Sequence, residues 1–114
     1  GKLLRCQAAV LVAIAIPVFT SQLERAREAT DLSNIRAAYA EAVSEYLANG
    51  ATEAQTATVK SVQQQDAGWL LNDGAPVLKT RVNGSEKDVT LPSIKTGDTV
   101  TVSVAADGTV SVTK

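Results

Sequence analysis

Several chemically versatile side chains are absent or scarce. Histidine and methionine do not occur, and cysteine occurs once among the 114 residues. The chain therefore lacks the usual general base, the Cys/His ligands of zinc sites and an internal disulfide bond. The formal charge of −1 shows no excess of cations, so direct binding to nucleic acid is not expected.

No residue spacing typical of a catalytic or cofactor-binding site is present either. The scattered Asp and Glu residues form neither an acid/base pair nor a calcium-binding loop, and no glycine-rich phosphate loop occurs. We interpret the carboxylates of the second half of the chain mainly as turn residues: Asp66, Asp73, Glu86, Asp88, Asp98 and Asp107. The sequence therefore predicts that the chain is not an enzyme, and it predicts no catalytic residue, metal ligand or cofactor.

Apolar residues are concentrated in the first part of the chain. Residues 1–50 contain 28 apolar positions and residues 51–114 contain 23, while Ser plus Thr rise from 5 to 15 between the two parts. The overall hydrophobic content of 45% therefore averages an apolar segment with a polar one. Together they fit one small domain with a modest core.

The most apolar run lies near the N-terminus. No Asp, Glu, Lys or Arg lies between Arg5 and Glu24, and residues 8–19 are apolar throughout. A helix over that run spans about 18 Å, less than the roughly 30 Å hydrocarbon core of a bilayer, so it is too short to cross a membrane alone. It is either a signal-like segment, although no small-residue cleavage site follows, or the remnant of a longer apolar helix in which residues 1–8 are altered.

Pro17 and Ser21 lie where this apolar run ends. A proline inside a helix removes one backbone hydrogen bond and clashes with the preceding turn, so we expect a kink before Pro17. Ser21 and Glu24 match a capping box, which would restart a helix at this point. The alternative is a continuous helix that carries Ser21 on its surface.

A helix is predicted over residues 9–49. From Phe19 to Leu47, apolar residues recur every three or four positions, the period of an amphipathic helix, and Asn49 with Gly50 forms a typical helix stop. About 28 residues of helix extend about 40 Å, more than a small domain covers, so part of the helix should project. We interpret the interspersed charges as a solvated face, with some pairing between subunits in an assembly: Glu24, Arg25, Arg27, Glu28, Asp31 and Arg36.

Residues 50–75 are predicted to connect this helix to the rest of the chain. Thr52 and Gln55 bracket a second possible capping box, which favours a short helix near residues 53–65. Trp69 follows in a compact apolar group. A lone tryptophan in a small domain usually anchors the core, so this role is favoured over an exposed ligand contact.

Residues 76–114 are predicted to form antiparallel strands. Apolar positions alternate over residues 77–82, 87–91, 99–104 and 110–112, and turn-forming residues separate these segments. Such a sheet has one apolar face, which the second half of the helix is able to cover. The predicted fold class is α+β, with a long N-terminal amphipathic helix packed on a three- to four-stranded antiparallel sheet. The predicted helix–sheet core consists of Ile35, Tyr39, Val43, Tyr46 and Leu47.

One segment carries a family resemblance. Residues 9–19 read A-V-L-V-A-I-A-I-P-V-F and continue into Gln22, Leu23, Glu24 and Arg25. This pattern resembles type IV pilins, in which an apolar helix reaches an I-A-I-P-x-F segment, continues as an amphipathic helix and is wrapped by a four-stranded antiparallel sheet. The resemblance covers about residues 9–50, and the remaining residues agree only at the level of architecture.

The resemblance implies a structural subunit of a type IV pilus, a filament used for adhesion, surface motility or aggregation. Residues 9–19 would pack between identical subunits, with a kink at the proline. The resemblance also implies an extracellular pilus on a bacterial surface, a precursor held in the cytoplasmic membrane, and the pilus assembly machinery and prepilin peptidase as partners. The implied assembly residues are Val10, Leu11, Val12, Ile14, Ile16, Pro17, Phe19 and Leu23.

The first residues depart from the family pattern. An aromatic residue followed within one turn by a glutamate is missing, and residues 1–7 resemble no part of the family. We therefore expect an altered or truncated N-terminus. Two other functions stay open: a pseudopilin of type II secretion or a competence pilin for DNA uptake, and a soluble adhesin or binding module on a helical stalk.

Overall fold

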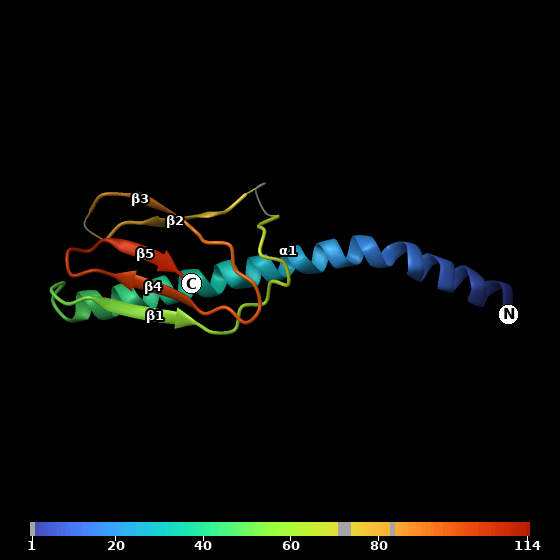
Figure 1. The fold of residues 1–114 in the computed structure, drawn as a ribbon, viewed down its shortest axis with the longest axis horizontal. Helices are drawn as coiled ribbons and strands as arrows, with labels where there is room; N and C mark the ends of the chain where they lie inside the picture. Colours follow the sequence, from blue (N-terminus) through green and yellow to red (C-terminus); the bar gives the residue numbers. More distant parts are fainter. Residues whose placement is uncertain (1, 71–73, 83) are drawn as a thin grey trace.

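A computed structural model describes residues 2–70, 74–82 and 84–114, with side chains from Gln22 onward. The fold is α+β, with one helix packed on antiparallel sheets. In Figure 1 the helix runs along the whole molecule, and the strands gather over its C-terminal part. The elements are α1 (Lys2–Ala48), β1 (Gln55–Val59), β2 (Val77–Thr80), β3 (Lys87–Thr90), β4 (Val100–Val104) and β5 (Val110–Thr113).

Helix α1 ends next to the Asn49-Gly50 pair that predicted its end. The Gly50 amide donates to the Leu47 carbonyl at 3.1 Å, and the Ala51 amide donates to the Tyr46 carbonyl at 2.9 Å. These two bonds form a Schellman motif, which needs a left-handed residue, and Gly50 has a φ of 77°. The next residue, Ala51, is also left-handed, with a φ of 59°.

The helix is unbroken at its apolar end. It runs through Pro17 and Ser21 without interruption, so the predicted restart at Ser21 is wrong and the continuous alternative holds. A kink before Pro17 stays a prediction.

The strands form two sheets instead of the single three- to four-stranded sheet that was predicted. One sheet has the order β1-β4-β5, and the other pairs β2 with β3, all antiparallel. In the register of the larger sheet, Val102 lies opposite Ala57 on one side and Val112 on the other. Strands β3 and β5 lie close together without forming a ladder.

Strand β1 replaces the short helix that was predicted near residues 53–65. The capping-box pattern around Thr52 did not start a helix. Instead, Gln55–Val59 pairs along its whole length with β4. Within β1, Ala57 and Val59 are buried, while Thr56 and Thr58 are exposed, which is the alternation of a half-buried strand. Pairing with a distant strand outweighed the weak local helix signal.

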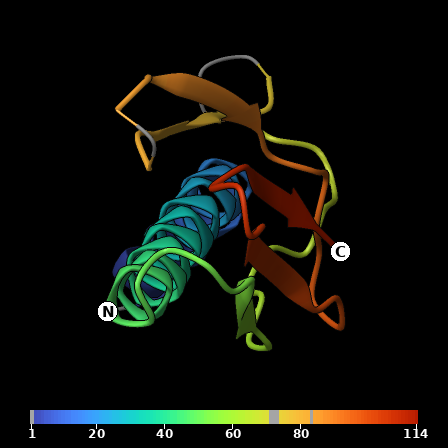
Figure 2. The ribbon, with the colours of Figure 1, turned by 90° about the vertical axis from the view of Figure 1, so that its left-hand side faces the viewer.

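The core lies between α1 and the strands. Figure 2 shows β1, β4 and β5 along one side of the helix, with β2 and β3 continuing around it. Val100, Val102 and Val104 of β4 are fully buried, because every second residue of this central strand faces the helix. The other buried apolar residues of this core are Ile35, Ala38, Ala42, Tyr46, Ala57, Val59, Val62, Trp69, Leu78, Leu91, Ile94 and Val112.

Candidate functional site

The N-terminal part of α1 projects beyond the strands. The molecule measures 70 × 23 × 18 Å along its principal axes, and Figure 1 shows the first part of the helix without strands beside it. The predicted assembly residues 10–19 all lie in this helix, in the part for which only the backbone is described. Leu23, the last of the predicted assembly residues, is 44% exposed.

Over the residues that the structure describes, α1 contains no stretch that is both long enough and apolar enough to cross a bilayer.

Four of the five predicted core residues lie in or against the core, and one does not. Ile35 and Tyr46 are buried, and Tyr39 and Val43 are half-buried against them. Leu47 is 56% exposed, so its assignment to the core is corrected. It follows Tyr46 directly, and one residue corresponds to a rotation of about 100° around a helix, which turns Leu47 away from the strands.

Three helix carboxylates are buried where the strands and loops begin to cover α1. Glu24 is 5% exposed, and Glu28 and Asp31 are 0% exposed. The prediction that these residues belong to a solvated face is therefore wrong. Their spacing of four and three residues places them on one face of the helix, in line with Ile35. We call Glu24, Glu28 and Asp31 the carboxylate ladder.

The carboxylate ladder binds backbone amides of the segment that follows β1. Asp31 accepts from the Gln63 amide at 2.7 Å through Oδ1 and from the Gln64 amide at 3.0 Å through Oδ2. Both oxygens of one buried carboxylate are thus engaged by neighbouring N–H groups. Hydrogen bonds to a charged acceptor are stronger than neutral ones, so Asp31 holds this segment firmly.

The other two members of the ladder extend the same arrangement along the helix. Glu24 accepts from the Gln65 amide at 3.0 Å and from the Asp66 amide at 3.3 Å, and Glu28 accepts from the Leu70 amide. Arg27 forms an ion pair with Glu24 at 3.3 Å, one turn along the helix. The ladder therefore supplies hydrogen-bond acceptors to a segment that lies outside the sheets.

The spacing of residues along the helix indicates the carboxylate ladder, although the prediction of a solvated face did not take it into account. Counting back from the buried residues Ala42, Ala38 and Ile35 in steps of three and four leads to Asp31, Glu28 and Glu24. Carboxylates that continue an apolar stripe point toward the covered side of the helix, and buried charges need partners. The segment around residues 63–70, which has no regular backbone pairing of its own, provides those partners.

Trp69 anchors the same segment to the core. Its side chain is buried, and its Nε1–H donates to the Pro92 carbonyl at 3.0 Å. The predicted core role of this tryptophan is therefore confirmed. Val62, which precedes this segment in the sequence, is also buried. The Thr96 amide binds the Gln64 carbonyl at 2.7 Å, and the Thr96 hydroxyl binds the Val62 carbonyl at 3.0 Å.

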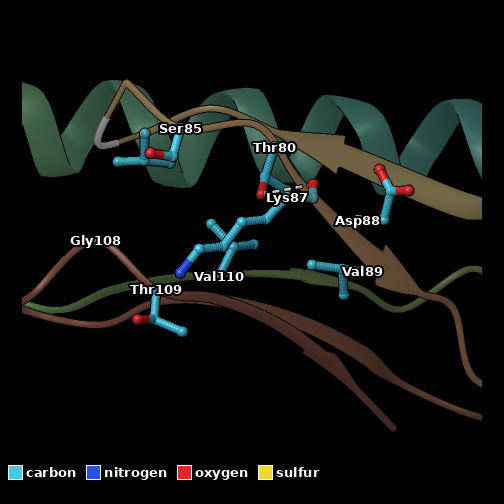
Figure 3. Close-up of a pocket in the computed structure, with 9 residues that line it drawn as sticks. Thr80, Ser85, Lys87, Asp88, Val89, Gly108, Thr109 and Val110 are labelled. Atoms are coloured by element: carbon cyan, nitrogen blue, oxygen red, sulfur yellow. Dashed lines mark hydrogen bonds between the residues drawn. The ribbon is translucent and has the colours of Figure 1, made fainter.

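A cavity of about 220 Å³ lies between the β2–β3 hairpin and the turn before β5. Figure 3 shows Lys87 reaching across it toward Thr109, with Val89 and Val110 also directed into it. The Thr80 hydroxyl donates to the Lys87 carbonyl at 3.2 Å at its edge. The cavity lies where β3 and β5 approach without pairing.

A second, more open groove of about 240 Å³ separates α1 from β1 and is lined by Asn34, Ala37, Ala38, Glu41, Thr58, Val59, Lys60 and Ser61.

The turn before β5 carries a perturbed carboxyl group. The Thr109 amide donates to Asp107 Oδ1 at 2.9 Å. This bond, together with one from the Thr109 hydroxyl and the charge of Lys87, holds the pKa of the exposed Asp107 below its usual range.

Within residues 2–70, 74–82 and 84–114, no group of three metal-ligating side chains is placed to hold a metal ion.

Comparisons with family models, curated proteins and solved structures found no match to this chain. The resemblance to type IV pilins therefore depends on the residues that carry it. The described geometry adds a projecting helix, the carboxylate ladder at the start of the covered part, and two small cavities near the strands.

Proposed function

We propose that the chain is the structural subunit of a type IV pilus-like filament. In this proposal identical subunits assemble through the apolar N-terminal part of α1, and the strands form the outer surface. The chain has no catalytic role and uses no cofactor. The observation that carries the proposal is the projection of residues 9–19, the segment that resembles the pilin helix, beyond the strands.

Physical chemistry supports assembly through this end of the helix. An apolar run that projects into water costs free energy, and packing it against copies of itself removes apolar surface at about 25 cal/mol per Å². A single buried leucine contributes about 1.5–3 kcal/mol on this scale. Leu23 lies at the boundary of the projecting part, and its partial exposure makes it a suitable contact for a neighbouring subunit.

Two exposed leucines of α1 provide a matched test, because Leu23 lies near the middle of the helix and Leu47 lies at its C-terminal end. Leu23→Arg would place a charge in the proposed interface, whereas Leu47→Arg would place the same charge away from it, at the end of the helix. Each variant is expressed from the native locus, and the cell surface is imaged by electron microscopy beside a deletion strain. We expect filaments with Leu47→Arg and none with Leu23→Arg or the deletion.

Other outcomes would refute the proposal or redirect it. Unchanged filaments in the deletion strain would contradict the role of main pilus subunit. If deletion instead abolished protein secretion or DNA uptake while surface filaments persisted, the pseudopilin or competence alternative would replace it. Normal filaments with Leu23→Arg would contradict assembly through this end of the helix.

A further inference from the structure

The segment of residues 63–66 is attached to the fold in an unusual way. It belongs to no helix or strand, and its four consecutive amides all donate to the carboxylate ladder, at Asp31 and Glu24. The side chains of residues 63, 65 and 66 are exposed, so they contribute little apolar burial. We call residues 63–66 the strap. Its closed position depends on charge-assisted hydrogen bonds and on one carbonyl contact with Thr96.

One strap residue works against the closed position. The side chain of Gln64 is fully buried, and within the described residues neither its Nε2 nor its Oε1 has a hydrogen-bond partner. A buried polar group without a partner loses the hydrogen bonds that water would give it. Opening the strap would return this amide to water, so Gln64 favours opening while the carboxylate ladder favours closure.

The strap is flanked by two buried residues. Val62 precedes it and Trp69 follows it, and both belong to the core. Local opening in proteins typically involves segments with few buried apolar contacts between better anchored elements. The length between Val62 and Trp69 allows the strap to lift while these two side chains stay in place.

We propose that the strap is a local opening unit whose balance is set by Asp31 and Glu24 against Gln64. Its opening uncovers the two carboxylates on α1, directly after the projecting part of the helix, without unfolding either sheet. The groups that set the balance are the four strap amides, the two carboxylates, Arg27 beside Glu24, and the buried Gln64 amide. This proposal does not depend on filament assembly.

Asp31→Asn is the most direct test. The carboxylate meets an N–H group with each of its oxygens, whereas an asparagine must present its own NH₂ to one of them. One donor then faces another donor, and a charge-assisted bond is lost. We expect amide hydrogen exchange in the strap to rise about 10- to 100-fold, as follows from the usual strength of such bonds.

Gln64→Met tests the opposing side of the balance. Methionine has a similar shape and carries no amide, so the closed strap no longer buries a polar group without a partner. We expect strap amides to exchange several-fold more slowly than in the wild type. Glu45→Gln removes a charge from an exposed position on the same helix and serves as the control, with exchange in the strap unchanged.

Two further readouts separate local opening from general unfolding. Trp69 is the only tryptophan, so its fluorescence reports whether the far side of the strap stays packed. The Val102 amide in β4 reports the central sheet. Asp31→Asn should leave both unchanged. Three results would contradict the proposal. The first is an exchange rate of the strap amides in Asp31→Asn equal to that in Glu45→Gln, and the second is a joint loss of protection at the Val102 amide and the strap amides. The third is faster exchange of the strap amides in Gln64→Met.

Discussion

Tyr46→Phe removes one hydroxyl group that joins the end of α1 to the β4–β5 turn. The buried Tyr46 hydroxyl lies 2.8 Å from the Ala106 carbonyl and 3.0 Å from the Ala51 carbonyl. It has a single proton to donate, so the two carbonyls share it. Phenylalanine keeps the ring and its packing, and therefore the change isolates the polar contribution.

The expected cost is about 1–2 kcal/mol of unfolding free energy, because a partly buried hydrogen bond shared by two carbonyls is lost. For a domain of this size that corresponds to a fall in Tm of about 5–10 °C. Scanning calorimetry and urea unfolding measure the two quantities independently, and an unchanged m-value would show that only stability has changed.

Tyr39→Phe is the matched control. The Tyr39 hydroxyl accepts a hydrogen bond from the amide of the exposed Arg81 at 3.2 Å. When the hydroxyl is removed, that amide can donate to water instead. We expect a loss below about 0.5 kcal/mol. Equal losses for the two variants, or a loss below about 0.5 kcal/mol for Tyr46→Phe, would refute the reasoning that the burial of Tyr46 makes its hydrogen bonds count more.

Three other changes test separate parts of the fold. Val102→Ala removes two methyl groups from the centre of the core and should cost about 2–3 kcal/mol by urea unfolding, whereas Val77→Ala, at a 39% exposed position, should cost well under half of that. Ala51→Gly should raise stability by about 1 kcal/mol, because glycine adopts the left-handed φ of 59° without steric strain, and a lower Tm would contradict this. Asp107 has a lowered pKa, so its contribution to stability is present above the pKa of the unfolded chain and is lost as the pH falls through the folded pKa. NMR titration should place the Asp107 midpoint below the usual range. In Thr109→Ala the midpoint should return part of the way, because alanine removes the hydroxyl hydrogen bond and keeps the backbone amide that donates to Asp107.

The sequence predicted most elements of the fold because their signals are local. The Asn49-Gly50 pair marks the end of α1, and alternating valines mark β4 and β5. Strand β1 was missed because its pairing partner lies more than forty residues away in the sequence, while the nearby capping-box pattern favours a helix. The division into two sheets was missed for a related reason, since it depends on how β3 and β5 approach each other in space.

The candidate site was harder to predict than the fold. Glu24, Glu28 and Asp31 have the spacing of an ordinary exposed charged face, and nothing local distinguishes such a face from a ladder of amide acceptors. The distinction depends on whether another segment covers that side of the helix. Only the register with Ile35, which is buried, relates the three carboxylates to the covered face.

The central position of β4 has a consequence for folding during synthesis. Val100, the first residue of β4, lies 52 positions after Ala48, the last residue of α1 (100 minus 48). The covered face of the helix is therefore made long before the strand that covers it. Distant pairings of this kind close slowly, and uncovered apolar surface is prone to association in the meantime. During synthesis, the core therefore stays incomplete until most of the chain after the helix has been made.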